Sequence, residues 1–150
     1  MRIALYEPDI AGNVGTILRT AACMGLGVDL IEPMGFPFGA RALARSGMDY
    51  AAAVDVRRHA DWDAFVAGVT GRIVLATTKG AVRLDEALFE AGDTLLFGSE
   101  GAGVPPHVHA RADARVLIPM VPGMRSLNVA VSAGIVAAEA LRQTRGWPAP

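Results

Sequence analysis

The sequence predicts an α/β fold in which a mostly parallel sheet is covered by helices on both faces. Short apolar runs alternate along the chain with stretches of helical periodicity, which is typical of repeated βαβ units. Several of the runs are apolar without alternation, as expected of strands that are covered on both faces. The chain has 150 residues, of which 52% are hydrophobic, so residues 1–150 are expected to form a single domain with a substantial core.

Each expected element has a local signal. Six apolar runs are predicted as strands: 2–6, 28–32, 54–58, 72–77, 94–98 and 115–118. The first helix is expected to begin with Asn13 as its N-cap and to end at Gly25 or Gly27. Further helices are expected at 39–46, from Asp61 through 66, from Pro105 and Pro106 to about 112, and from 127 to 142. The last of these is apolar almost all round, which predicts that one side meets the sheet and the other a second subunit in a homodimer.

The charge balance excludes attraction to nucleic acid or to an acidic membrane through bulk charge, because 14 Lys and Arg stand against 15 Asp and Glu. The single cysteine, Cys23, excludes an internal disulfide and fits a reducing compartment. The three histidines lack the clustering of a metal site, so no metal is expected. The N-terminus turns acidic at Glu7, too early for a signal peptide, and the longest uncharged run, 126–138, is too short to span a bilayer. These features predict a soluble cytoplasmic protein.

Four segments that follow predicted strands carry the candidate functional residues: 7–19, 77–80, 98–105 and 119–128. Ligands of open α/β sheets bind beyond the carboxyl ends of the strands, where such segments meet. Glu100 stands in a glycine-rich loop whose backbone a ligand can approach closely, and Lys79 is the only lysine of the chain. Each segment also has a purely structural interpretation: a capped helix with a solvated Arg19, an ordinary turn, a glycine-rich turn, and N-capping by Ser126.

Taken together, the four segments resemble the ribose 2′-O-methylating branch of the SPOUT superfamily of S-adenosylmethionine-dependent RNA methyltransferases. The three motifs of that branch occur in order: Asn13-x-Gly15-x-x-x-Arg19-x-Ala21, then Gly98-Ser99-Glu100-Gly101-Ala102-Gly103, then Ile118-Pro119-Met120 followed by Ser126-Leu127-Asn128. Other stretches along the whole chain, such as Leu5-Tyr6-Glu7-Pro8 and Thr77-Thr78-Lys79-Gly80, are similar to members that methylate the wobble nucleotide of tRNA.

The resemblance implies a deep trefoil knot near the C-terminus, a homodimer, and one domain without a separate RNA-binding domain. It implies methyl transfer from S-adenosylmethionine to the ribose 2′-hydroxyl of nucleotide 34 of tRNA, a cytidine or modified uridine in leucine tRNAs. The partner would be the tRNA anticodon loop. The residues implied to hold the methyl donor are Ala76, Thr77, Gly98, Glu100, Ile118, Ser126, Leu127 and Asn128.

The resemblance also assigns catalytic roles to Arg19, Asn13 and Glu100. Arg19 would contact the 2′-hydroxyl or the adjacent phosphate and is the proposed base. A guanidinium stays protonated at neutral pH, so stabilising a developing alkoxide or orienting phosphate suits it better. Asn13 would orient the region of Arg19, and Glu100 would pair with Arg19 or order the donor loop. Contacts with RNA are expected from Arg19, Arg41, Arg45, Arg57, Arg58 and Lys79.

Three alternative functions stay open on the sequence alone. Within the same superfamily, the target could be the ribose of another tRNA or rRNA nucleotide. The chain could instead be a dinucleotide-binding oxidoreductase domain, against which the missing third glycine of that fingerprint argues. It could also be a non-catalytic module that binds S-adenosylmethionine or RNA, against which the intact Arg19 and Glu100 argue.

Overall fold

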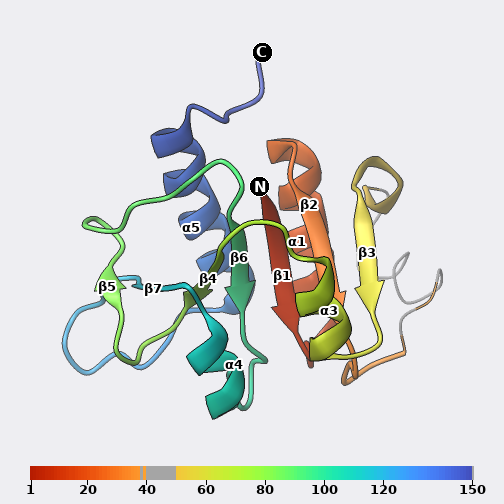
Figure 1. The fold of residues 1–150 in the computed structure, drawn as a ribbon, viewed down its shortest axis with the longest axis horizontal. Coiled ribbons are helices and arrows are strands. Elements are labelled where there is room, and N and C mark those ends of the chain that lie inside the picture. The colour runs from red at the N-terminus through yellow and green to blue at the C-terminus, as the bar shows by residue number, and fades with distance from the viewer. Residues whose placement is uncertain (38, 40–49, 150) are drawn as a thin grey trace.

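The computed structural model describes residues 1–37, 39 and 50–149, and within these ranges seven strands form one sheet in the order β3-β2-β1-β6-β4-β7-β5 (Figure 1). Every strand pairing in this sheet is parallel, which confirms the predicted sheet type. The strands are β1 (Arg2–Tyr6), β2 (Gly27–Ile31), β3 (Val56–His59), β4 (Ile73–Ala76), β5 (Val82–Arg83), β6 (Thr94–Phe97) and β7 (Ala114–Leu117). The sequence did not predict β5, because two exposed residues at a sheet edge give no apolar run.

Helices cover both faces of the sheet, as predicted (Figure 1). One face carries the long helices α1 (Ala11–Met24) and α5 (Val129–Thr144), which also contact each other. The opposite face carries the short helices α3 (Trp62–Gly68) and α4 (Pro106–Arg111). A 3₁₀ turn, η1 (Ala51–Ala53), precedes β3. Residues 40–46 of the helix expected at 39–46 lie outside the described residues.

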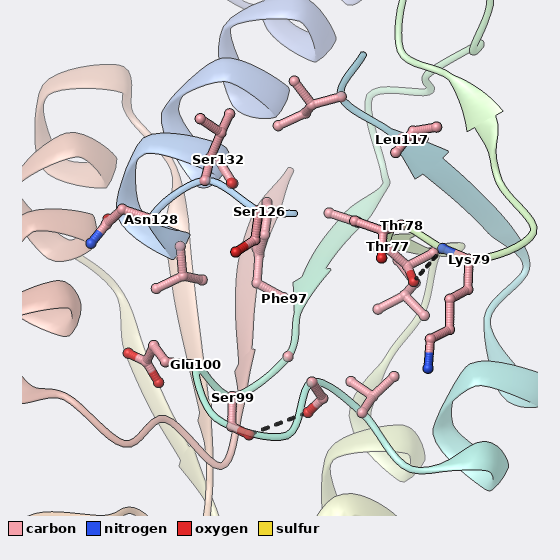
Figure 2. A pocket seen from close by; sticks show the side chains of 18 of the residues that line it. Thr77, Thr78, Lys79, Phe97, Ser99, Glu100, Leu117, Ser126, Asn128 and Ser132 are labelled. Carbon is pink, nitrogen blue, oxygen red and sulfur yellow. Dashed lines mark hydrogen bonds between the residues drawn. The ribbon is translucent and has the colours of Figure 1, made fainter. Parts of the chain in front are cut away.

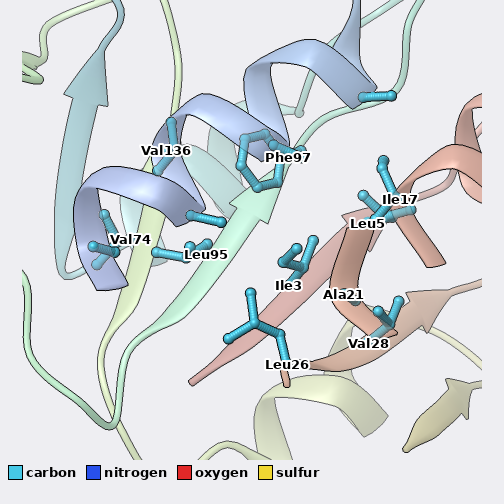
Figure 3. Close-up of a cluster of buried hydrophobic side chains, with 14 of the residues drawn as sticks. Ile3, Leu5, Ile17, Ala21, Leu26, Val28, Val74, Leu95, Phe97 and Val136 are labelled. Carbon is cyan, nitrogen blue, oxygen red and sulfur yellow. The ribbon is translucent and has the colours of Figure 1, made fainter. Parts of the chain in front are cut away.

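The central strands are apolar without alternation because each strand supplies side chains to two separate clusters. Ile3 and Leu95 pack with Val136 of α5 on one face, a cluster that Figure 3 shows at close range. Their chain neighbours Ala4 and Leu96 point to the other face and pack against the helices there. Burial on both sides is the reason these strands lack the polar positions of a half-exposed sheet.

Two of the predicted helix starts are wrong. The N-cap of α1 is Ile10, which makes no side-chain capping bond, and Asn13 lies inside the first turn with its amide free for other contacts. The N-cap of α5 is Asn128 rather than Ser126, because Asn128 Oδ1 accepts hydrogen bonds from the amides of residues 130 and 131, at 2.8 and 3.3 Å. The predicted cap Asp61 is confirmed, since its carboxylate accepts from the Ala64 amide at 2.8 Å.

The last helix is buried on only one side within a single chain. Ala133, Val136 and Ala140 are fully buried against the sheet, whereas Val131 and Ile135 keep 51% and 37% of their surface exposed. The sheet-facing half of the prediction is therefore confirmed, and the homodimer stays a prediction. The trefoil knot also stays a prediction.

The order of the strands places their carboxyl ends where a ligand site is expected. From β1 the chain runs through α1 to β2 on one side, while β6, the other neighbour of β1, leads to α4 and β7 on the opposite side. Loops that leave adjacent strands in opposite directions open a crevice at the carboxyl edge of the sheet. The segments that follow β1 and β6 therefore face each other across this crevice.

Candidate active site

A pocket of about 580 Å³ lies beyond the carboxyl ends of three adjacent strands, β6, β4 and β7 (Figure 2). Its walls come from the segments that follow these strands, from the start of α1 and from the N-terminus of α5. All the residues predicted to hold the methyl donor line it: Ala76, Thr77, Gly98, Glu100, Ile118, Ser126, Leu127 and Asn128. Asn13 and Lys79 line it as well. The parallel sheet thus brings the four candidate segments to one site.

The side chain of Asn13 connects two walls of this pocket. Its Nδ2 donates a hydrogen bond to Glu100 Oε1 at 3.0 Å, and its Oδ1 accepts one from Asn128 Nδ2 at 2.9 Å. Asn128 in turn caps α5, so the start of α1, the loop after β6 and the N-terminus of α5 are held together. Among the described residues, the side-chain amide of Asn13 hydrogen-bonds to Glu100 and Asn128 and not to Arg19. The expected role of Asn13 in orienting the region of Arg19 stays a prediction.

Asp9 completes the network and was missed in the sequence. The Asp9 amide donates to Glu100 Oε2 at 2.8 Å, and Asp9 Oδ2 accepts from the Gly101 amide at 3.1 Å. The two loops therefore bind each other through a reciprocal pair of bonds, and both oxygens of Glu100 are engaged. A carboxylate shortly after β1 was the only signal in the sequence, since the residues it contacts lie about 90 positions away.

The loop after β6 is a tight turn that requires glycine. Ser99 and Gly103 bond to each other through both backbone amides, at 3.0 and 2.9 Å. A Cβ on Gly98 would lie 2.5 Å from the carbonyl carbon of Gly103, and Gly103 itself has a φ of +68°. The glycines of this motif therefore fold the loop back on itself and place Glu100 toward Asn13.

The turn after β4 is held in place from α4. The Lys79 amide donates to Thr77 Oγ1 at 3.2 Å, and the Lys79 carbonyl accepts from His109 Nε2 at 3.2 Å. His109 lines the pocket and was not singled out in the sequence, because its contact depends on how α4 packs. The Lys79 side chain extends along the side of the pocket opposite Glu100 (Figure 2).

Arg19 does not line the pocket of its own chain. At 1.5 Å per residue it lies about 9 Å further along α1 than Asn13. Its guanidinium is exposed and lies over the ring of Tyr50, with Cζ 5.1 Å from the ring centroid. Within a single chain the two Glu100 oxygens accept from Asn13 and Asp9 and not from Arg19, and the expected pairing of Glu100 with Arg19 stays a prediction.

Two of the predicted RNA contacts lie far from the pocket. Arg57 and Arg58 belong to β3, the edge strand at the opposite end of the sheet from β7 and β5. Arg57 pairs with Asp55 at 3.1 Å, and Arg58 pairs with Glu32. Each of these two guanidinium groups thus already has a carboxylate partner within the chain. Arg41 and Arg45 lie outside the described residues.

The residues of the pocket fit an extended ligand with an apolar portion and polar ends. Leu75, Val116 and Ile118 supply apolar walls, and Thr77 and Ser126 supply hydroxyls. Its volume is within the usual range of roughly 300–1,000 Å³ for cofactor and small-molecule sites. Among the described residues, no group of three or more His, Cys, Asp or Glu is placed to hold a metal ion. None of the helices in the described ranges is long and apolar enough to cross a membrane.

Fold and site together define a class of protein: an α/β protein with a pocket of small-molecule size in the loops beyond the carboxyl ends of parallel strands. The sequence pattern of the SpoU rRNA Methylase family matches residues 1–138, and the chain belongs to this family. The membership confirms the resemblance carried by the three motifs.

Relatives with almost the same length have a more specific activity in their names. The tRNA (cytidine(34)-2′-O)-methyltransferase of Ancylobacter novellus is 49% identical over an alignment of 150 positions that covers 98% of this chain and 95% of the relative. A solved structure concerned with 2-OH methylation of C/U34 on tRNA superposes with a TM-score of 0.89 and 42% identity, over 95% of this chain and 94% of the other. The AdoMet-bound rRNA methyltransferase of Sinorhizobium meliloti superposes with a TM-score of 0.84 and 30% identity, over 94% of this chain and 55% of the other.

Proposed function

We propose that this protein transfers a methyl group from S-adenosylmethionine to the ribose 2′-hydroxyl of nucleotide 34 of tRNA, a cytidine or modified uridine in leucine tRNAs. One observation carries the proposal: every residue implied to hold the methyl donor lines a single pocket, in a chain 49% identical to a tRNA (cytidine(34)-2′-O)-methyltransferase. The structural likeness to a protein studied for methylation of C/U34 supports the same nucleotide.

The pocket residues would hold the donor through the strand ends. S-adenosylmethionine supplies an electrophilic methyl group when bound. Ala76 ends β4, and Gly98 and Ile118 directly follow β6 and β7. Their backbone groups are therefore rigidly placed to contact the adenine base of the donor. Leu75 and Val116 exclude water from the inner wall. Fixing the donor in one orientation is the main requirement of a displacement reaction of this kind.

Asn13, Glu100 and Asn128 act as positioning residues in this proposal. Both oxygens of Glu100 accept hydrogen bonds within the chain, so the carboxylate connects two loops. The Asn13 amide then sets the distance between the loop after β6 and the start of α5. The network therefore determines the shape of the pocket where the ribose must enter.

Arg19 has to reach a second copy of the pocket to act in the reaction. The exposed apolar side chains Val131 and Ile135 of α5, with Val121 and Met124 before it, form a surface that a second subunit would bury in a homodimer. Across such an interface, Arg19 of one protomer would enter the pocket of its partner. Its guanidinium would donate hydrogen bonds to the 2′-oxygen or the adjacent phosphate and stabilise negative charge as the hydroxyl proton leaves to solvent.

The remaining expectations belong to the same proposal. This domain would bind the anticodon loop in the cytoplasm, and the dimer would supply the extended surface for it. Unpaired loop nucleotides expose their bases and 2′-hydroxyls, which suits recognition without reading a duplex.

Methyl incorporation into defined transcripts tests the proposal. The purified protein and S-adenosylmethionine carrying a labelled methyl group are incubated with a leucine tRNA transcript and with the same transcript containing a 2′-deoxynucleotide at position 34. Label is expected in the first only, because the second lacks the accepting oxygen. Equal label in both would place the modification elsewhere, and donor binding without any label would favour a non-catalytic binding module.

A further inference from the structure

Most arginines of the described residues already have a carboxylate partner. Those in ion pairs are Arg2, Arg57, Arg58, Arg72, Arg83, Arg111 and Arg142. Within the same ranges, the basic side chains without a carboxylate partner are those of Arg19, Lys79, Arg115, Arg125 and Arg145. The near-zero net charge therefore conceals an uneven distribution of available positive charge.

An available cation and a paired one differ in what they offer to RNA. A guanidinium in an ion pair must exchange its carboxylate for phosphate, so little is gained. An exposed, unpaired one gains a charge-assisted contact and releases counterions from the nucleic acid. The unpaired cations are therefore the better candidates for contacts with the RNA backbone.

Two of these unpaired cations flank the pocket. Lys79 lies in the turn after β4 and lines the pocket, and Arg125 directly precedes the lining residue Ser126 in the segment after β7. The two strands are neighbours in the sheet. In contrast, Arg145 lies at the far end of α5, about 24 Å from the start of that helix at 1.5 Å per residue. The Arg115 guanidinium donates a hydrogen bond to the His109 carbonyl at 3.1 Å.

The surroundings of Arg125 place it outside the donor site itself. Ser126, Leu127 and Asn128 line the pocket, whereas Arg125 is exposed and does not. Its backbone is anchored three residues further on, where Asn128 caps α5 and bonds to Asn13. On the other side, a turn closes with a bond from the Met124 amide to the Val121 carbonyl at 3.2 Å. The Arg125 side chain therefore extends from an anchored stretch of backbone beside the pocket and can contact what enters the pocket from solvent.

We propose that Arg125 binds a backbone phosphate of the RNA strand whose ribose enters the pocket, with Lys79 as a second cation on the neighbouring turn. The inference rests on the proposed function and adds a residue that the sequence motifs did not single out. A ribose at the pocket mouth carries a phosphate on each side, and a bidentate guanidinium matches phosphate geometry.

The experiment compares Arg125→Ala with Arg83→Ala, a control that removes an exposed arginine which is paired with Asp85 at 2.9 Å and does not line the pocket. The dissociation constant of tRNA is measured over a series of salt concentrations for both variants and the wild type. Arg125→Ala is expected to raise the dissociation constant of tRNA about tenfold. The slope of the logarithm of this constant against the logarithm of the salt concentration should decrease in magnitude by about 0.7, the value for one single-strand phosphate contact. Arg83→Ala should leave both quantities unchanged.

Further readouts separate the other contacts that Arg125 could make. Arg125→Lys keeps the charge and should retain the wild-type salt slope with intermediate affinity. The affinity for S-adenosylmethionine and the oligomeric state should not change in any variant. An unchanged tRNA affinity and slope in Arg125→Ala would overturn the inference. So would a weakened donor affinity, which indicates contact with the donor, or loss of dimerisation, which indicates contact with the second subunit. Failure of the wild type to methylate any tRNA would refute the proposed function separately.

Discussion

The Nδ2 of Asn13 lies 3.0 Å from Oε1 of Glu100, a hydrogen bond between residues 87 positions apart in the chain. It joins the first turn of α1 to the loop after β6, on the two sides of the crevice where the strand connections diverge. The bond explains why both motifs need their particular residue: a shorter or apolar side chain at either position would leave the two loops unconnected. The pocket is therefore a property of the tertiary network and not of any one motif.

Glu100→Gln should disrupt this network while keeping the size of the side chain. Glutamine offers one acceptor oxygen where Glu100 accepts from two donors, so either Asn13 or Asp9 loses its bond. A lost hydrogen bond of this kind costs about 1–3 kcal/mol, so turnover should fall about 5- to 150-fold. Steady-state methylation of tRNA measures the effect. The exposed Glu86→Gln is the control and should keep wild-type turnover; equal turnover in both variants would remove Glu100 from the account.

Gly98→Ala should weaken donor binding by forcing the loop after β6 to open. The added Cβ would meet the backbone of Gly103 at 2.5 Å, a distance that requires the chain to move. Calorimetric titration with S-adenosylmethionine should show affinity reduced at least about tenfold, since contacts fixed by the strand ends are lost. Gly68→Ala at the end of α3 is a matched control, because nothing lies within 4 Å of its added Cβ. Wild-type affinity in Gly98→Ala would show that this turn does not shape the donor site.

Arg19→Ala should keep donor affinity and reduce turnover by about 10² to 10³, the usual range for losing one group that stabilises developing charge. Mixed dimers test from which subunit Arg19 acts. Chains of Arg19→Ala and Gly98→Ala are mixed and allowed to form dimers at random. A dimer with one chain of each kind has an intact site only if Arg19 enters the partner's pocket, because the normal Gly98 of one chain then meets the normal Arg19 of the other. Activity should then return to about a quarter of the wild-type value. If Arg19 acts in its own chain, every site carries a defect and no activity should return.

Val131→Glu should convert the protein to a monomer. Val131 is 51% exposed on the outer side of α5, and a carboxylate there would have to be buried in the dimer interface. Light scattering after size-exclusion chromatography measures the mass. Leu88→Glu places the same charge on another exposed apolar residue, 81% exposed in the loop before β6, and should leave the mass unchanged. A Val131→Glu variant with the mass of the wild type would locate any subunit interface elsewhere.

Acid should destabilise the fold partly through Glu139. Hydrogen bonds from Arg142 and then Gln143 lower the pKa of the Glu139 carboxyl to about 2 in the folded chain. Because the folded pKa is depressed, the stabilisation is present above the carboxyl's ordinary pKa of 4.5 and is lost as the pH falls towards 2. Chemical unfolding at pH 2 to 5 should therefore show a shallower pH dependence for Glu139→Gln than for the wild type. Parallel curves would contradict this role.

Local signals in the sequence determined much of the fold. The strand β1 has the bounds predicted for it. Asp61 caps the N-terminus of α3 through its carboxylate, and Gly25 ends α1 with the positive φ that glycine adopts readily. The short edge strand β5 escaped prediction because Val82 and Arg83 are exposed and carry no pattern. Its pairing with β7 depends on register within the sheet, which no local signal encodes.

The candidate site, like the fold, has features that the sequence predicts and features that depend on tertiary packing. Motif residues such as Gly98 and Ser126 could be predicted to share a pocket, because the carboxyl ends of parallel strands meet at one edge. The contacts within the pocket could not. Asn13 and Ser126 are both acceptable N-caps in isolation, and only the approach of Glu100 and Asn128 decides that the Asn13 amide is used elsewhere. The availability of each arginine likewise depends on carboxylates that tertiary packing brings near.

The most direct measurement is mass spectrometry of nucleotide 34 in tRNA from the source organism after deletion of the gene for this protein. Incubation of that tRNA with the purified protein and S-adenosylmethionine, followed by nuclease digestion, should restore a 2′-O-methylated nucleotide at position 34 of leucine tRNAs. Arg19→Ala should restore little of it. A nucleotide 34 that is methylated to the same extent with and without the gene, or that stays unmethylated after incubation, would contradict the account.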